Sequence, residues 1–204
     1  MKPEELIQRS PEWWAYRAGR CTASRVADVA PSRTKTRAKY LRELVAERLS
    51  GIPIIKRVPG LEARGELEPE ARLAYEFYHD CTVKEVGFID HPTIEFSGCS
   101  PDGIVGRKGG IEIKCCDSQN HIEVLKTGII DPDYLAQIQF NMACTKRAWW
   151  DYVSFDPRMP EDLKLFVKRI IRDDHAIAKL ETQVMDFLAE VDRELNAIRN
   201  GGAK

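Results

Sequence analysis

The sequence predicts an α/β fold in which helices flank a central mixed β-sheet. Apolar residues recur at helical spacing in the first third of the chain, short strand-like runs follow, and helical and strand-like segments alternate in the last third. The 204 residues are 43% hydrophobic, which is enough to bury a core. We expect a single domain over residues 1–204, with a basic helical region at 1–60 packed on the core and a C-terminal helix at 173–199.

The helices predicted near the N-terminus are marked by residue spacing and by helix-end residues. Residues 10–29 are predicted to form arginine-rich helical turns. In residues 36–49 apolar side chains recur every three or four positions, and Gly51 supplies an expected C-terminal glycine. A third helix spans about 69–79, because Pro69 between two glutamates suits a helix start.

The middle of the chain predicts a meander of short strands. The strand-like runs lie at residues 83–89, 94–99, 103–105 and 111–115. The Lys108–Gly109 pair suits a hairpin turn between the last two runs.

The last third of the chain predicts a helix that begins near Asp131, two strands at 148–155 and 163–171, and a long amphipathic helix. This final helix carries one apolar stripe, which predicts a face that packs on the core or on another subunit. The stripe consists of Ile177, Leu180, Val184, Phe187, Val191, Leu195 and Ile198.

The composition excludes several classes of protein. The longest run without Asp, Glu, Lys or Arg in the second half has 12 residues, short of the ~20 that a membrane helix needs. Glu4 and Glu5 lie where a signal peptide needs a basic and then apolar leader, so we expect a cytoplasmic protein. The six cysteines and four histidines show no ligand spacing, so we expect reduced thiols, and any metal must be held by carboxylates.

The most informative pattern is the sequence SPDG around Asp102, followed ten residues after this aspartate by EIK from Glu112 to Lys114. In a strand, Glu112 and Lys114 point to the same face, and Asp102 lies across the predicted hairpin, so the three groups can converge. This convergence suits phosphodiester hydrolysis, since two carboxylates and a main-chain carbonyl can hold Mg²⁺ while the lysine stabilises developing negative charge. The alternative is a solvated edge strand with ordinary surface ion pairs.

Two further polar residues are candidates for the same site. Glu68 lies at the start of the helix at 69–79, where acids also simply complement the helix dipole. Gln137 follows Tyr134 by three residues and shares its helix face, which makes it a candidate partner of a metal-bound water.

Together these segments resemble the PD-(D/E)xK nuclease superfamily, and more closely the phage lambda exonuclease-like, or YqaJ-like, viral recombinase exonucleases. The resemblance rests on GELE at Glu68, SPDG at Asp102, IEIK ending at Lys114 and YLAQ ending at Gln137. It covers most of the chain, from residue 14 to 159. It implies a restriction-endonuclease-like core in a single nuclease domain.

The resemblance implies a catalytic centre with two Mg²⁺ ions, for which Mn²⁺ can substitute. The matching lysine would be the active-site lysine, and the matching glutamine would help to place metal and water. The implied catalytic set is Glu68, Asp102, Glu112, Lys114 and Gln137, and the implied metal ligands are Asp102, Glu112 and the carbonyl oxygen of Ile113.

A second implied feature is a pocket for the 5′-phosphate of DNA. Arg17, Ser24 and Ser100 match its residues, and a guanidinium binds phosphate oxygens in pairs. Leu61 matches an apolar residue that wedges between the strands at the duplex end, whereas an ordinary loop anchor is the alternative.

One position departs from the family pattern. Six residues beyond Lys114, where the lambda enzyme has a further arginine for the terminal phosphate, this chain has Asn120. Arg20 or His121 could supply that contact instead, and we leave the position unassigned.

The charge distribution is compatible with a nucleic-acid substrate despite a net charge of -1. Residues 1–60 carry a charge of +7 and residues 61–204 a charge of -8. Because one acid stands among eight bases between residues 17 and 42, we expect this segment to contact DNA, with Arg20 and Arg33 among its contacts. Binding should then be sensitive to salt.

The leading hypothesis is an Mg²⁺-dependent exonuclease that degrades the 5′-ended strand of duplex DNA, releases mononucleotides and leaves 3′ overhangs for phage-type recombination. The resemblance implies a homotrimeric ring on DNA ends and a single-strand-annealing recombinase as partner, in the cytoplasm of a bacterial host and with no membrane partner. Two alternatives stay open: an endonuclease of restriction or junction-resolving type, and a non-catalytic DNA-binding protein. The intact Asp102, Glu112 and Lys114 argue against the second.

Overall fold

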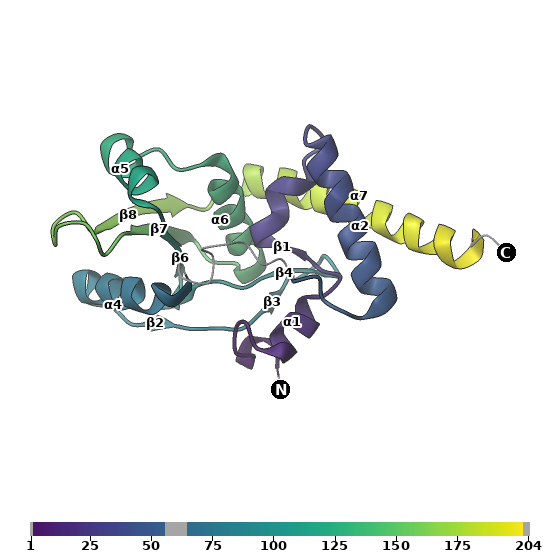
Figure 1. The fold of residues 1–204 in the computed structure, drawn as a ribbon, viewed down its shortest axis with the longest axis horizontal. Coiled ribbons are helices and arrows are strands. Elements are labelled where there is room, and N and C mark those ends of the chain that lie inside the picture. Colours follow the sequence, from purple (N-terminus) through teal and green to yellow (C-terminus); the bar gives the residue numbers. More distant parts are fainter. Residues whose placement is uncertain (1, 56–64, 202–204) are drawn as a thin grey trace.

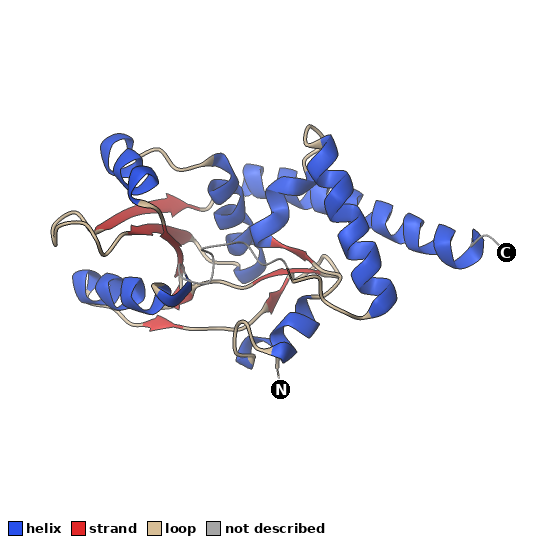
Figure 2. Cartoon of the chain, viewed as in Figure 1, coloured by secondary structure: helices blue, strands red, loops and turns tan. Residues whose placement is uncertain are grey.

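The computed structural model describes residues 2–55 and 65–201, and its helices lie around two β-sheets (Figure 1). The strands are β1 (Cys21–Thr22), β2 (Val83–Lys84), β3 (Ile89–Asp90), β4 (Ser97–Cys99), β5 (Gly103–Val105), β6 (Gly109–Cys115), β7 (Trp149–Phe155) and β8 (Leu165–Ile171). The helices, drawn in blue in Figure 2, are the 3₁₀-helices η1 (Pro3–Glu5) and η2 (Ala23–Val29) and the α-helices α1 (Pro11–Arg17), α2 (Thr34–Ser50), α4 (Glu68–His79), α5 (Ser118–Thr127), α6 (Pro132–Thr145) and α7 (Asp174–Gly201).

The larger sheet is mixed, with the strand order β2-β5-β6-β7-β8. Strands β6 and β7 are parallel, and the other neighbours in this sheet are antiparallel. The smaller sheet has the order β1-β4-β3. The predicted α/β fold with mixed sheet and flanking helices is confirmed, but the strands form two sheets rather than one.

Apolar side chains cover both faces of the larger sheet. On one face, Ile111 and Ile113 of β6 pack with Tyr75 of α4. On the other, Trp150 and Tyr152 of β7 belong to a cluster that includes side chains of α2, α6 and α7. Removing this apolar surface from water holds the helices on the sheet. None of the helices in the described ranges is long and apolar enough to cross a membrane.

The β5–β6 hairpin has its turn at residues 106–108. Of the predicted Lys108–Gly109 turn, Gly109 already belongs to β6, where it pairs with Val105. Gly106 has a φ of +50°, which glycine adopts without strain. A Cβ atom at Gly109 would lie 2.1 Å from the Trp149 ring, so a side chain there would push the hairpin away from β7.

The strand predicted over residues 83–89 is wrong as one element, because β2 and β3 belong to different sheets. Residues 3–6 of the N-terminal segment contact the chain between β2 and β3, at Gly87 and Phe88. The main-chain N–H of Gly87 donates to the carbonyl oxygen of Glu4 at 2.9 Å, and a Cβ atom at Gly87 would lie 2.2 Å from the carbonyl oxygen of Leu6. Backbone groups that would extend β2 therefore bond the N-terminal segment instead.

Two other parts of the chain differ from the sequence prediction. Residues 10–29 contain strand β1 between α1 and η2, and β1 pairs in parallel with β4. Helix α5 was not predicted, although both of its ends carry signals. Asp117 caps its start by accepting a hydrogen bond from the main-chain N–H of Asn120 at 3.0 Å, and Gly128 ends it with a φ of +62°.

Candidate active site

The β5–β6 hairpin brings Asp102, Glu112 and Lys114 together. Asp102 immediately precedes β5, and its Oδ2 accepts a hydrogen bond from the main-chain N–H of Ile113 at 2.7 Å. Nζ of Lys114 donates to Oε1 of Glu112 at 2.7 Å. Glu112 is only 2% exposed and β6 is the middle strand of its sheet, which excludes the alternative of a solvated edge strand.

Two amide side chains of α6 complete the surroundings of Glu112. Nε2 of Gln137 donates to Oε1 of Glu112 at 2.6 Å, and Nδ2 of Asn141 donates to Oε2 at 2.9 Å. These residues are four apart and therefore lie on one helix face. A buried carboxylate is costly unless it is paired and hydrogen-bonded, and Glu112 has both kinds of partner. The sequence analysis did not identify Asn141. The available signal was its spacing of four residues from Gln137, which places both side chains on one helix face.

Negative charge accumulates at this site. Burial raises the pKa of Asp102 well above its usual range, and the nearby Glu112 carboxylate adds to the rise. Burial alone would lower the pKa of Lys114, but the charges of Glu112 and Asp102 outweigh it and raise that pKa. The lysine is therefore a stable ammonium beside two acids that repel each other.

The oxygen atoms of Asp102, Glu112 and the carbonyl of Ile113 fit a hard divalent cation, which prefers oxygen ligands. Oδ1 of Asp102 has no hydrogen-bond partner among the described residues, and a cation beside it would offset the repulsion from Glu112. Within residues 2–55 and 65–201, no group of three or more His, Cys, Asp or Glu side chains could hold a metal ion. A metal here would thus need main-chain or water oxygens in addition to the two carboxylates.

A cavity of about 390 Å³ lies beside these residues, lined by Glu68, Lys114, Asn120 and Tyr134 among others. Glu68 is the first residue of α4. Nζ of Lys114 lies 4.6 Å from the centroid of the Tyr134 ring, a cation–π distance that adds a second contact to the lysine.

The position that departs from the family pattern lies on α5. Asn120 lines the cavity but donates its amide to Oδ2 of Asp117 at 2.9 Å. His121 is 0% exposed and lies within hydrogen-bonding distance of Ser154 Oγ (2.7 Å) and the carbonyl oxygen of Leu163 (2.8 Å). The suggestion that His121 supplies the missing phosphate contact is therefore wrong, because its ring is enclosed and both nitrogens are engaged.

Arg17, Ser24 and Ser100 lie together at the C-terminal end of α1. Nη1 of Arg17 donates to Oγ of Ser100 at 3.0 Å, and Nη2 donates to Oγ1 of Thr22 at 3.4 Å and Oγ of Ser24 at 3.5 Å. The guanidinium also lies 4.2 Å from the ring centroid of Trp13. Thr22 was not recognised in the sequence as a member of this group.

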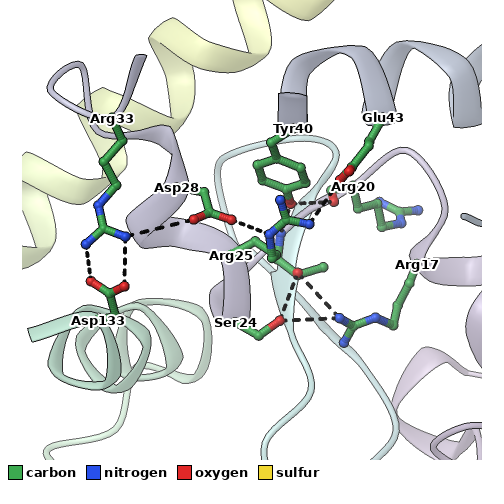
Figure 3. A network of polar contacts seen from close by, with 10 residues as sticks. Arg17, Arg20, Ser24, Arg25, Asp28, Arg33, Tyr40, Glu43 and Asp133 are labelled. Carbon is green, nitrogen blue, oxygen red and sulfur yellow. Dashed lines mark hydrogen bonds and ion pairs between the residues drawn. The ribbon is translucent and has the colours of Figure 1, made fainter. Parts of the chain in front are cut away.

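Arg17 differs from neighbouring arginines in having no acidic partner among the described residues. Figure 3 shows Arg25 paired with Asp28, and Arg33 paired with Asp133. Arg17 contacts hydroxyl groups instead, among them that of Ser24 (Figure 3). Burial lowers the pKa of Arg17 to about 10, so the side chain is still protonated at neutral pH. A partly desolvated cation without a counter-ion favours binding of an anion.

The other residues expected to contact DNA have different surroundings. Arg20 lies 3.4 Å from a carboxylate oxygen of Asp90 and lines a cavity of about 180 Å³ together with Arg17 and Ser24. Arg33 pairs with Asp133 of α6. An acid from a distant segment therefore offsets part of the positive charge of the N-terminal region. Leu61 lies outside the described residues.

Comparisons with known proteins identify a domain family and similar structures. The YqaJ-like viral recombinase domain matches residues 12–148. The crystal structure of an alkaline exonuclease, LHK-Exo from Laribacter hongkongensis, is similar with 48% sequence identity and a TM-score of 0.87, over 93% of this chain and 96% of that one. A phage related exonuclease from Haemophilus somnus 129PT shares the fold, with 18% identity and a TM-score of 0.67 over 88% of this chain and 96% of that one.

A shorter sequence match is found in Escherichia coli strain K12. Its protein ExoD is 31% identical over 65 residues, which are 32% of this chain and 74% of that protein. The match of the domain over most of the chain identifies the family, so the chain belongs to the YqaJ-like viral recombinase domain family.

Proposed function

We propose that this protein is a metal-dependent DNA exonuclease that removes nucleotides from the 5′-ended strand of duplex DNA and leaves a 3′ overhang. The observation that carries the proposal is the hydrogen bond of 3.0 Å between Arg17 and Ser100. Ser100 precedes Asp102 by two residues, a separation of at most about 7 Å between Cα atoms. An arginine that has no acidic partner within the described part of the chain thus lies beside the candidate catalytic carboxylates, where it can hold a terminal phosphate next to the bond to be cut.

The relatives support the same activity. The similar protein with 48% identity is an alkaline exonuclease, and its structure has also been determined in complex with dAMP. A bound mononucleotide is compatible with release of mononucleotides as products.

In the proposed reaction, a water oxygen forms a bond to phosphorus and the bond from phosphorus to the 3′-oxygen breaks. The released mononucleotide keeps the old 5′-phosphate, and the shortened strand gains a new one. Arg17, Ser24 and Ser100 hold the terminal phosphate, while Lys114 stabilises the charge that develops on the phosphate being cut. Gln137 fixes the carboxylate of Glu112 and helps to place the attacking water.

Mg²⁺, held by Asp102, Glu112 and the carbonyl of Ile113, would offset phosphate charge and acidify a water. The proposal includes two ions at the site, with Mn²⁺ able to replace Mg²⁺ and Glu68 helping to place them. The support is the oxygen-rich donor set and the resemblance to the lambda exonuclease-like enzymes.

That resemblance also supports a homotrimeric ring, a single-strand-annealing recombinase as partner and action in the cytoplasm of a bacterial host. A closed ring would retain DNA by topology rather than by affinity. Light scattering after size-exclusion chromatography should give a mass three times that of the chain, and a monomer mass would contradict the ring.

Digestion of linear duplex DNA labelled at either end, with and without a 5′-phosphate, tests the activity. We expect early Mg²⁺-dependent release of the 5′ label as a mononucleotide, late release of the 3′ label, and faster digestion of phosphorylated ends. Covalently closed circular DNA should stay intact. Cutting of the circle would indicate an endonuclease, and DNA binding without Mg²⁺-dependent turnover would indicate a non-catalytic protein.

A further inference from the structure

An arginine that the sequence analysis did not assign contacts the candidate site from the N-terminal segment. Arg9 lies between η1 and α1, and its Nη2 donates to Oε1 of Glu68 at 2.7 Å. The Arg9 side chain is 53% exposed and that of Glu68 is 27% exposed. Among the described residues, no other side chain bonds to the Glu68 carboxylate.

The backbone conformation of Arg9 and the space at Gly65 surround this guanidinium. Arg9 has a φ of +69°, a left-handed conformation that residues other than glycine rarely adopt. Gly65, three residues before Glu68, leaves room for the guanidinium, because a Cβ atom there would lie 2.2 Å from Nη1 and 2.7 Å from Cζ of Arg9. The ion pair therefore joins a residue in a strained conformation to a segment where glycine leaves room for the guanidinium.

The charges explain why Glu68 needs a partner. Glu68 lines the same cavity as Ile113 and Lys114, so its carboxylate lies at the candidate metal site. The ammonium of Lys114 offsets part of the charge of Glu112 and Asp102, but among the described residues it bonds Glu112 and Gln137 rather than Glu68. A partly exposed glutamate at a helix start is otherwise free to turn towards water. Arg9 opposes that movement with a charge-assisted hydrogen bond.

We propose that Arg9 is a positioning residue that holds the Glu68 carboxylate at the cavity lined by Ile113 and Lys114 before metal and DNA bind. The inference rests on the proposed function only in taking Glu68 as a residue that helps to place the metal. Arg9 bonds Oε1 of Glu68, and no side chain among the described residues bonds Oε2. It acts through Glu68 and is not itself a catalytic residue.

The direction in which removal of Arg9 changes metal affinity separates a positioning role from a purely electrostatic one. A positive charge near a cation site repels the cation, so removal of Arg9 would strengthen metal binding if charge were its only contribution. If Arg9 positions Glu68, its removal weakens metal binding instead. Loss of a hydrogen-bonded partner behind a metal-binding group typically weakens metal affinity by roughly 10- to 100-fold.

Calorimetric titration of Mn²⁺ into the wild-type protein and Arg9→Gly, without DNA, tests this role. Glycine adopts the same positive φ without strain, so the variant removes the guanidinium and keeps the backbone. We expect Mn²⁺ binding to be weaker by roughly tenfold or more. Unchanged or tighter binding would overturn the positioning role.

A further variant controls for indirect effects. In a Glu68→Ala background, Arg9→Gly should have no further effect, because the residue it positions is gone. A full additional loss in that background would show that Arg9 does not act through Glu68.

The titration does not depend on turnover, so the two proposals fail differently. A wild-type protein that binds Mn²⁺ but does not degrade linear duplex DNA would overturn the proposed function and leave the role of Arg9 to be decided by the titration. A wild-type protein that binds no Mn²⁺ would overturn both.

Discussion

Asn141 donates its side-chain amide to Oε2 of Glu112 at 2.9 Å, and Gln137, one helical turn earlier, donates to Oε1 at 2.6 Å. The two amides hold both oxygens of a carboxylate that is only 2% exposed. Oδ1 of Asn141 is buried and has no hydrogen-bond partner among the described residues. An unsatisfied buried acceptor costs stability, so the favourable contribution of Asn141 comes from its Nδ2 donor, which bonds Glu112.

Asn141→Leu removes that donor at similar size and leaves Oε2 of Glu112 unpaired. We expect the maximal rate of nucleotide release to fall by roughly 10- to 100-fold, as for other residues that orient metal ligands. The matched control is Gln139→Leu, because Gln139 lies on the same helix but bonds the main chain of Ile171 and Asp173. The control should lower thermal stability and keep the rate per folded molecule. A fully active Asn141→Leu protein would contradict this role.

Arg17→Ala should remove the preference for 5′-phosphorylated ends. Hydrogen bonds to charged groups contribute about 1.5–3 kcal/mol, so digestion of phosphorylated duplex should slow by roughly tenfold or more, to the rate seen with 5′-hydroxyl ends. The comparison uses initial rates on both duplexes. Arg37→Ala is the matched control, because Arg37 is already paired with Glu190 of α7. If Arg17→Ala still digested 5′-phosphorylated duplex faster than 5′-hydroxyl duplex, Arg17 would be excluded from the phosphate pocket.

Stability in acid should depend on Asp156, which fastens the start of α5 to the end of β7. Its Oδ2 accepts from Oγ of Ser118 and its Oδ1 from Nε of Arg158, each at 2.7 Å. Burial alone would raise the pKa of Asp156, but these hydrogen bonds outweigh it and hold the pKa at about 2. Because an unfolded aspartate has a pKa of about 3.9, this stabilisation is complete above about pH 4 and is lost as the pH falls through 2.

Thermal unfolding of Asp156→Asn across that pH range checks the prediction. The variant should melt below the wild-type protein at neutral pH, and the difference should shrink as the pH falls from about 4 to 2. Asp162→Asn, which changes an exposed acid in the following loop, should match the wild-type protein throughout. A difference that stayed constant with pH would show that the charge of Asp156 contributes nothing.

The sequence predicted the parts of the site that depend on local periodicity. Alternation along β6 places Glu112 and Lys114 on one face and the isoleucines on the other, and the helix that begins after Asp131 carries Gln137 to them. The ion pair between Arg9 and Glu68 could not be predicted, because it joins positions 59 residues apart and requires a left-handed arginine.

The differences between the predicted and the observed fold also arise from contacts between segments that are distant in the sequence. Strand β2 ends where the N-terminal segment takes over the backbone hydrogen bonds near Gly87, a contact that no local pattern encodes. The pairing of Arg33 with Asp133, 100 residues away, likewise depends on how α6 packs. A charge count along the chain therefore overestimates the positive charge that the N-terminal region offers to DNA.

Release of labelled nucleotides from 5′-phosphorylated linear duplex by Lys114→Ala tests the account most directly. Lys114 is bonded to Glu112 and stands beside Asp102, so its loss should abolish Mg²⁺-dependent release while the fold is kept. Lys108→Ala, which changes an exposed lysine at the turn of the same hairpin, should release nucleotides at the wild-type rate. Release by Lys114→Ala at the rate of Lys108→Ala would contradict the assignment of this site as the nuclease centre.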